Sequence, residues 1–382
     1  MPHRCYAQLP GYVAPIYSFT DGVDGGEPTG GVVADGNGNL YGETYLGGTA
    51  ACTLLQQPIK SGCGTVYRYS RDTGLTTLVS FNGTNGANGN NTLTLVGKTL
   101  YGTTTKGGLN DYGVVFSVHI DGTNFRLLHQ FDGNDGSSPV GILRIGPNHL
   151  LYGVTKYGGN ANAGVLFSLA PNGKFAILHQ FAASKVDGGY PETLLIDRNT
   201  LFGGTLAGGG NITLCEEPGC GTVFEYNITT NSYRQIFTLG GYPWSGGYLG
   251  SIGPGPTIYG NGVNSLYSLS KATGATNIGF LNASFQGENA SGPLLTPGGT
   301  LIGISGDSNP YSSGQLYSAQ TTAYGAVTVL AIFTDSAGSN PLAQPIVING
   351  RIIGTASLGG KCSKCGSIWV YRAYASQSRQ RR

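Results

Sequence analysis

One short phrase, Leu-Tyr-Gly-x-Thr, recurs along the chain and constrains its fold more than any other feature. Clear copies stand at residues 40–44, 100–104, 151–155 and 201–205, and weaker ones at 258–260, 301–305 and 352–355. They follow one another about every 50 residues, close to the repeat length of a propeller blade. The recurrence predicts seven copies of one unit, with the central glycine allowing a neighbouring blade or loop to approach the backbone.

The third unit shows what each copy contains. Four short apolar or alternating segments, 139–145, 150–155, 164–169 and 175–181, are separated by turn sequences such as Gly146-Pro147-Asn148. Segments of this length between Gly, Pro and Asn residues are typical of strands. Four strands per repeat indicate a propeller blade, because packing blades face to face around an axis covers both faces of each sheet.

The two ends of the chain complement each other. The sequence opens with a fourth-strand segment, residues 14–19, and closes with a third-strand segment, residues 366–371. Pairing them would close a ring, which an open solenoid does not require. We predict an all-β, seven-bladed β-propeller of four-stranded antiparallel blades over residues 14–372. A short N-terminal tail (1–13) and a basic C-terminal tail (373–382) flank it.

Composition agrees with this fold and limits the partners. Glycine accounts for 66 of 382 residues and charged residues for only 10%, which suits short strands joined by tight turns. The net charge is +2 and no basic stripe is present, so no nucleic-acid partner is expected. No apolar run is long enough to span a membrane. We expect a monomer.

The repeat pattern resembles that of a known family. Leu-Tyr-Gly-Thr-Thr, a Gly-Gly loop, Gly-Thr-Val-Phe, a Leu-His-x-Phe strand and an Asp-Gly turn before Pro are similar to the GloVer (Gloeobacter/Verrucomicrobia) repeats of bacterial tandem-repeat proteins. The match is good in the first four units, as at residues 64–67 and 221–224, and weaker at 264–267 and 314–317. The resemblance implies a β-propeller and often an exported setting, and it supplies no catalytic residues.

Six of the seven cysteines occupy one place in the repeat. In each of three units the cysteines lie after the Leu-Tyr-Gly-x-Thr phrase, here called the anchor phrase, between its following Gly-Gly and the Gly that begins the third strand. The pairs are Cys52 and Cys63, Cys215 and Cys220, and Cys362 and Cys365. This predicts three local disulfides and favours an oxidising, extracellular or periplasmic compartment. Residues 1–5 show no signal-peptide core, so export would require a leader removed from this chain. Metal binding or redox chemistry at Cys362 and Cys365 is the alternative.

The loops between units and those between second and third strands are expected on one face, where binding residues tend to lie. Asp-Gly turns recur there. One interpretation is functional: the carboxylates line the loop-rich opening of the propeller, its mouth, and serve calcium binding or sugar hydrolysis. The other is structural: each Asp side chain bonds its own backbone in a tight turn. The carboxylate candidates for catalysis are Glu43, Glu192, Asp135 and Asp187, and further charged candidates are Glu27, Lys106, Lys156 and Lys185. Because a turn recurring in several blades fits a structural need, no cofactor is predicted.

Aromatic residues also gather in the sequence of this face. Their flat rings with polar edges suit stacking on sugars, and the candidate ligand-binding residues are Tyr112, Tyr157, Tyr190, Tyr242, Trp244 and Tyr248. The segment 242–248 breaks the repeat, which is where a unique site is most plausible.

No catalytic signature appears, and no histidine is expected at the mouth to serve as a general base. We interpret the chain as an exported binding module whose ligand is an extracellular polysaccharide. Two alternatives stay open: a glycoside hydrolase or polysaccharide lyase using the mouth carboxylates or Tyr and Lys, and a structural repeat domain of a cell-surface protein.

Overall fold

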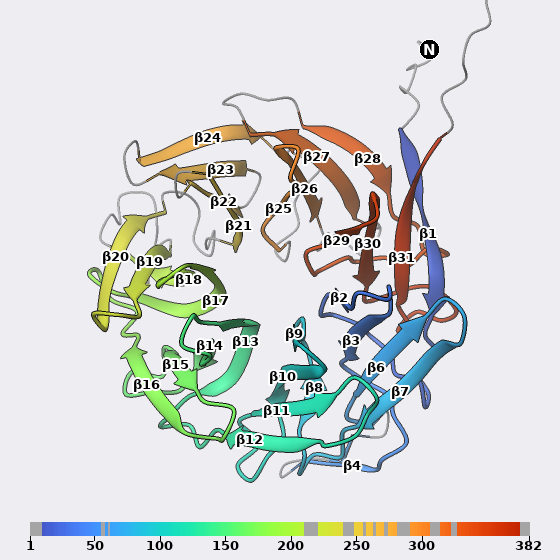
Figure 1. The fold of residues 1–382 in the computed structure, drawn as a ribbon, viewed down its shortest axis with the longest axis horizontal. Helices are drawn as coiled ribbons and strands as arrows, with labels where there is room; N and C mark the ends of the chain where they lie inside the picture. The colour runs from blue at the N-terminus through green and yellow to red at the C-terminus, as the bar shows by residue number, and fades with distance from the viewer. Residues whose placement is uncertain are drawn as a thin grey trace, which may run out of the picture.

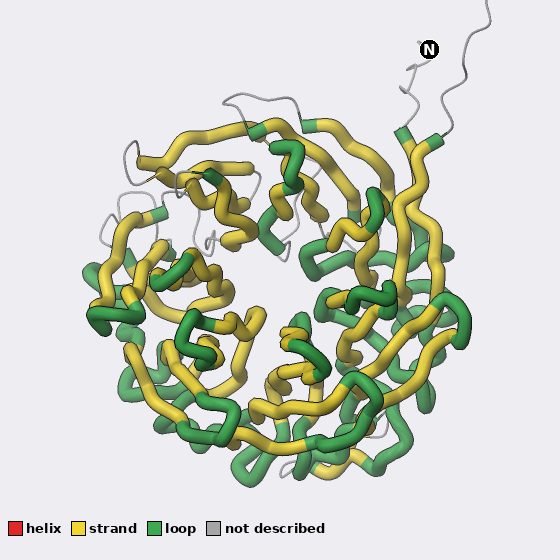
Figure 2. The backbone as a smooth tube through the Cα atoms, in the orientation of Figure 1, coloured by secondary structure: helices red, strands yellow, loops and turns green. Residues whose placement is uncertain are grey.

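A computed structural model describes residues 10–54, 58–59, 62–209, 221–239, 248–254, 257–262, 265–270, 274–280, 291–305, 314–321 and 327–374. Within these ranges the chain forms strands, turns and loops but no helix (Figure 2), and so none that could span a membrane. Seven sheets surround a central axis (Figure 1). The predicted seven-bladed, all-β propeller is confirmed.

The strands run outward from the axis in chain order within six blades, and in the seventh the outermost strand is β1. The first four blades contain β2 (Val33–Ala34), β3 (Leu40–Thr44), β6 (Thr65–Ser70) and β7 (Gly74–Ser80); β8 (Ala87–Gly89), β9 (Thr94–Val96), β10 (Thr99–Lys106), β11 (Val114–His119) and β12 (Arg126–Gln130); β13 (Ser137–Ile145), β14 (Leu151–Tyr157), β15 (Val165–Leu169) and β16 (Phe175–Gln180); and β17 (Gly188–Asp197), β18 (Thr200–Gly208), β19 (Thr222–Asn227) and β20 (Ser232–Thr238).

The remaining blades follow the same plan. They contain β21 (Tyr248–Gly253), β22 (Thr257–Gly262), β23 (Ser265–Ser270) and β24 (Gly274–Phe280); β25 (Leu294–Leu295), β26 (Thr300–Ser305), β27 (Gln315–Gln320) and β28 (Thr328–Ile332); and β29 (Ile346–Ile348), β30 (Arg351–Ala356), β31 (Ser367–Ala373) and β1 (Gly11–Ser18). The small β4 (Cys52–Thr53) and β5 (Pro58–Ile59) pair within a loop of the first blade.

The N-terminal strand closes the ring. β1 pairs antiparallel with β31 from Gly11 opposite Ala373 to Ser18 opposite Ser367, and the two strands lie side by side in Figure 1. Beyond them, the Tyr374 amide donates to the Pro10 carbonyl at 2.9 Å. The predicted completion of the last blade by the first residues is therefore confirmed, with a strand that begins at Gly11.

The glycine of the anchor phrase has the same neighbour in every blade. It lies directly opposite the aromatic residue of the third strand, in the pairs Gly42–Tyr67, Gly102–Phe116, Gly153–Phe167, Gly203–Phe224, Gly260–Tyr267, Gly303–Tyr317 and Gly354–Trp369. A Cβ on Gly153 would lie 2.4 Å from Phe167 Cζ. At Gly153 the expectation that a neighbouring blade or loop approaches the glycine is wrong, because Phe167 and Leu143 belong to the same blade. At Gly102 the expectation holds in part, because Glu43 of the first blade approaches as closely as Phe116 does.

Aromatic contacts between blades complete the core. In five of the described blade boundaries a phenylalanine after the outer strand packs against the third-strand ring of the next blade, as in Phe131–Phe167 with centroids 5.5 Å apart and Phe181–Phe224 at 5.2 Å. All four rings are almost fully buried. Fully burying a side chain of this size stabilises a fold by about 1.5–3 kcal/mol, so these contacts hold the blades together around the axis.

The innermost strands are irregular where they face the axis. Register shifts interrupt β13 between Val140 and Arg144, β17 between Pro191 and Thr193, and β21 between Leu249 and Ser251. In the second blade the inner strand splits into β8 and β9. Bulges redirect side chains and free backbone groups from the ladder, and here they occur at the wall of a central cavity.

Candidate functional site

A cavity of about 600 Å³ lies on the axis, a size typical of small-molecule sites. All seven blades contribute to its wall. The uncharged polar lining residues are Thr29, Asn90, Asn91, Thr92, Thr105, Ser138, Thr193, Ser291 and Gln344. Apolar residues, among them Val140, Ile142, Leu194, Leu249 and Leu342, line it as well, so the wall offers both polar and apolar groups.

Hydrogen bonds between blades fix this wall. Gln344 Nε2 donates to the carbonyls of Gly250 and Gly292 at 3.0 and 2.8 Å. Asn91 Nδ2 donates to the Pro139 carbonyl at 3.1 Å. The Gly250 carbonyl, at the bulge of β21, thus finds a hydrogen-bond donor on another blade.

An ion pair lies in the wall between the third and fourth blades. Lys156, at the end of β14, bonds the Glu192 carboxylate on β17. Burial raises the pKa of Glu192 above its ordinary value, although the Lys156 charge opposes the shift. This pair holds the one carboxylate candidate for catalysis that lines the cavity.

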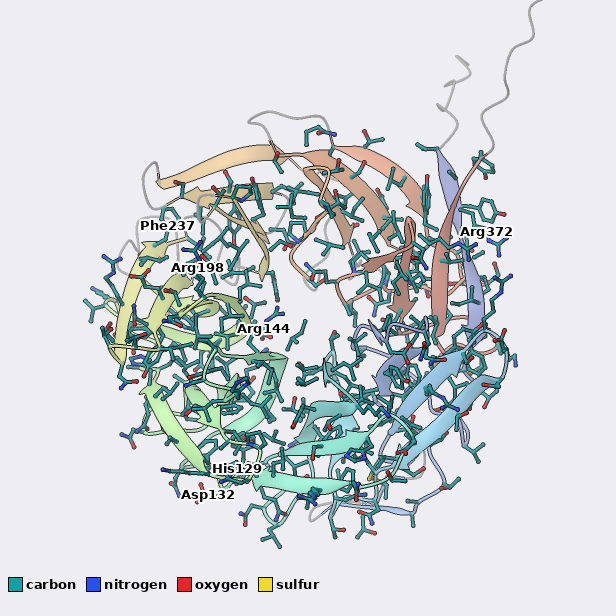
Figure 3. All side chains as sticks on the ribbon, in the orientation of Figure 1. His129, Asp132, Arg144, Arg198, Phe237 and Arg372 are labelled. Atoms are coloured by element: carbon teal, nitrogen blue, oxygen red, sulfur yellow. A yellow bond between two sulfur atoms is a disulfide. The ribbon has the colours of Figure 1, made fainter. Side chains whose placement is uncertain are left out.

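Arg144, on β13, also lines the cavity, and Figure 3 shows it at the inner edge of the ring. Its Nε donates to the Leu194 carbonyl of the next blade at 2.6 Å. Its two terminal nitrogens have no hydrogen-bond partner among the described residues. Burial lowers the pKa of the guanidinium to about 10, which leaves it positively charged at neutral pH.

Sequence reasoning missed Arg144. It stands inside the inner-strand segment 139–145, whose other residues are all uncharged. A single charged residue in a strand expected beside the axis is the signal that could have identified it.

Two further charged groups complete the lining. Lys106, at the end of β10, is exposed. Glu27 precedes the first blade, and its Oε1 lies 3.8 Å from Lys364 Nζ. Burial raises the pKa of Glu27 against the opposing charge of Lys364. Lys185, the remaining charged candidate, is exposed and does not line the cavity.

Three tyrosines line the cavity: Tyr45, Tyr157 and Tyr248. Tyr157 is 40% exposed and packs edge-on against Tyr190, with ring centroids 5.7 Å apart. Tyr190 thus supports a lining residue, whereas Tyr112 lies against Gly133 in a loop outside the cavity. Tyr242 and Trp244 fall outside the described residues.

Glu43 lies behind the wall and does not line the cavity. It is fully buried at the boundary between the first two blades, in space left by Gly89 and Gly102. Its Oε2 accepts from the Asn91 amide at 3.3 Å, and its Oε1 has no hydrogen-bond partner. Burial raises the pKa of this carboxyl well above its ordinary value. It supports the Asn91 backbone from behind.

Asp135 and Asp187 stand in a turn that several blades share. Each accepts a hydrogen bond from a histidine of the preceding outer strand, His129 Nε2 at 2.8 Å and His179 Nε2 at 3.1 Å. His129 lies at the outer edge of the ring in Figure 3. The side chain at this turn position also accepts from a backbone amide in the pairs Thr20–Asp24, Asn82–Asn85, Asp132–Asp135 and Ala182–Asp187.

The recurrence of this turn supports the structural interpretation of the Asp-Gly sequences. The described residues hold no cluster of three or more His, Cys, Asp or Glu side chains that would suit a metal ion. Neither Asp135 nor Asp187 lines the cavity.

Two of the three predicted disulfides, Cys52–Cys63 and Cys362–Cys365, are present. Cys215 and Cys220 lie outside the described residues. The Cys362–Cys365 loop contacts the site, because the Glu27 amide donates to the carbonyls of Lys364 and Cys365 at 3.1 and 3.3 Å. The disulfide thereby braces a lining residue at the seam where the ring closes.

Comparison with sequence families identifies the family of this chain. The sequence model of the Gloeobacter/Verrucomicrobia repeat matches residues 7–215. The chain belongs to this family. The family match ends in the fourth blade, and the later blades complete the ring of this Gloeobacter/Verrucomicrobia repeat protein with more divergent copies of the unit. A search of curated protein sequences finds no significant match.

Solved structures share the fold of this Gloeobacter/Verrucomicrobia repeat protein at low identity. Virginiamycin B lyase from Staphylococcus aureus matches with a TM-score of 0.62 and 12% identity over 94% of this chain and 98% of that one. A streptogramin B lyase matches with a TM-score of 0.61 and 10% identity, over 96% of this chain and 100% of that one. Puromycin hydrolase matches with a TM-score of 0.58 and 14% identity, over 96% of this chain and 56% of that one. At these identities the likeness concerns architecture alone.

Proposed function

We propose that this protein binds an extracellular polysaccharide in the central cavity. The observation that carries the proposal is the combination of three lining tyrosines from different blades with amide and hydroxyl side chains in the same wall. Sugar rings present apolar faces and hydroxyl edges, which aromatic rings and amide or hydroxyl side chains complement. The two disulfides suit an oxidising compartment and support export.

Binding of oligosaccharides to the wild type and to Tyr157→Ala tests the proposal. Tyr157 is 40% exposed in the cavity, and Tyr12, on the outer strand β1, is 42% exposed and serves as the matched control. We expect Tyr157→Ala to weaken binding about fivefold, since one stacked ring contributes on the order of 1 kcal/mol. Tyr12→Ala should bind as the wild type does. Failure of every glycan on a broad array to bind the wild type would refute the proposal.

A second candidate function rests on the Lys156–Glu192 pair. A buried carboxyl with a raised pKa beside a lysine is a possible proton donor and acceptor, as a glycoside hydrolase or polysaccharide lyase would need. Incubation with pectic, mannan and glucan substrates tests it. Product release that Glu192→Gln abolishes would favour this function, provided that it is retained by the control Glu225→Gln, which removes a carboxylate paired with the exposed Arg234 outside the cavity.

A further inference from the structure

The charges of the cavity wall are unequal once their pairings are taken into account. The lining contains three cations, Lys106, Arg144 and Lys156, and two carboxylic acids, Glu27 and Glu192. Glu192 is bonded by Lys156, and Glu27 lies near Lys364. Among the described lining residues, Arg144 and Lys106 are the cations left without an acidic partner.

The pKa values of the two acids strengthen this asymmetry. Burial raises the pKa of both Glu27 and Glu192, so each is easier to protonate than an exposed glutamate. Arg144, in contrast, stays charged at neutral pH, since its pKa is lowered only to about 10. The cavity therefore presents a net positive potential to whatever enters it.

Arg144 is positioned for recognition rather than for structure alone. One side of its guanidinium is anchored by the Nε bond to Leu194, which fixes the plane of the group. The two terminal nitrogens remain to donate in parallel, the geometry that binds two oxygens of one anionic group. A half-buried cation held in this way interacts with an anion more strongly than a fully exposed one, because water screens it less.

Arg144 and Tyr157 lie at different levels along the cavity wall. In the β13–β14 pairing Ser137 is opposite Tyr157, whereas Arg144 is opposite Tyr152. Five residues of strand separate the two levels, a distance of about 16 Å. A ligand that enters past Tyr157 meets the guanidinium at its inner end.

From this arrangement we infer that the ligand of the cavity is an acidic glycan whose anionic group is bound by the terminal nitrogens of Arg144. The inference rests on the proposed function and narrows its substrate class. A neutral glycan would leave the guanidinium paired only with hydroxyl groups or water, whereas a carboxylate accepts both donors at once. Lys106 adds long-range attraction that salt screens.

Titration calorimetry with three oligosaccharides of equal length tests the inference: oligogalacturonate, a sulfated galactan oligomer and a neutral galactan oligomer. The variants are Arg144→Gln, Arg144→Lys and the control Arg126→Gln, which removes the same charge from the exposed side of β12. Thermal unfolding of each variant establishes that it is folded. If Arg144→Gln does not fold, Arg144→Lys, which keeps the charge but not the planar fork, takes its place.

We expect oligogalacturonate to bind the wild type more tightly than the neutral oligomer, with affinity that falls as salt rises. Arg144→Gln should lose about 10- to 100-fold, Arg144→Lys should lose less, and Arg126→Gln should bind normally. Stronger binding of the sulfated oligomer, again lost in Arg144→Gln, would assign the anionic group to a sulfate ester.

The outcomes separate the inference from the proposed function. Equal binding of neutral and acidic oligomers, unaffected by Arg144→Gln, would overturn the acidic-glycan inference and leave glycan binding in place. Absence of binding by every oligomer would overturn the proposed function. In that case, free galacturonate that raises the melting temperature of the wild type but not of Arg144→Gln would show that Arg144 binds a carboxylate from another class of ligand.

Discussion

The ring of Phe167 lies directly opposite Gly153, so close that a methyl group on the glycine would come within 2.4 Å of the ring carbon Cζ. Leu143 approaches the same position, with its Cδ2 at 2.8 Å. The anchor glycine recurs because each blade folds an aromatic side chain over its own second strand.

Gly153→Ala is expected to destabilise the protein by about 1–3 kcal/mol, because the added methyl overpacks a filled site. Gly36→Ala is the matched control, since a Cβ at Gly36 would meet nothing within 4 Å. Urea unfolding of both variants gives the comparison. Equal midpoints for Gly153→Ala and the wild type would contradict the packing argument.

Glu43 predicts an unusual dependence of stability on pH. Its folded-state pKa is raised by burial, so the folded protein holds a proton that the unfolded chain releases above about pH 4.3. The contribution is fully present below that pH and is lost as pH rises toward the folded pKa, by about 1.4 kcal/mol per pH unit.

Glu43→Gln removes the titrating group while keeping its shape, so this loss should disappear. Unfolding free energies of wild type and variant, measured from pH 4 to 8, should diverge with rising pH, with the variant the more stable at pH 8. Parallel curves over that range would show that Glu43 is ionised at no cost.

The repeat made the fold predictable, while the site was predictable only in part. The spacing of the anchor phrase and the complementary ends identified the seven blades and the β1–β31 closure, because each blade needs the same four strands and the same Gly–aromatic packing. The positions of Tyr157 and Glu192 near the mouth also followed from strand order.

What the repeat did not reveal depends on small displacements. The bulge between Val140 and Arg144 decides which residue of β13 faces the cavity, and strand alternation alone does not locate a bulge. Glu43 stood out because the other blades carry smaller residues at its repeat position. Its larger side chain, however, fills space between two blades and does not line the cavity. Departure from a repeat therefore marks local packing as well as function.

Asp187 predicts acid sensitivity. Burial alone would raise the pKa of this carboxylate, but hydrogen bonds from His179 and Tyr233 outweigh it and lower the pKa below its ordinary value. The group's contribution to stability is present above about pH 3.9, the unfolded value, and is lost as pH falls through the lower folded pKa.

Asp187→Asn should cost about 1–3 kcal/mol at pH 7, because it weakens hydrogen bonds to a charged acceptor, and should flatten the acid side of the stability curve. The exposed Asp72→Asn should change neither. Chemical unfolding between pH 2.5 and 7 measures both effects. An unchanged acid limb in Asp187→Asn would assign the acid sensitivity to other carboxylates.

The two disulfides should differ in what their removal does. Cys52–Cys63 closes a loop with a sequence separation of 11 residues, and Cys362–Cys365 one of 3. In the chain-entropy picture the longer loop contributes about 2–3 kcal/mol and the shorter one roughly 1.5 kcal/mol. Replacing both cysteines of a pair by serine should therefore lower the unfolding free energy more for Cys52 and Cys63 than for Cys362 and Cys365.

Ligand binding should follow the opposite order. The short loop lies against Glu27 in the cavity wall, whereas neither Cys52 nor Cys63 lines the cavity. The Cys362→Ser, Cys365→Ser variant should therefore bind the glycan more weakly than the Cys52→Ser, Cys63→Ser variant, although it is the more stable of the two. A binding loss that simply tracks stability would mean that the Cys362–Cys365 loop braces the ring without shaping its cavity.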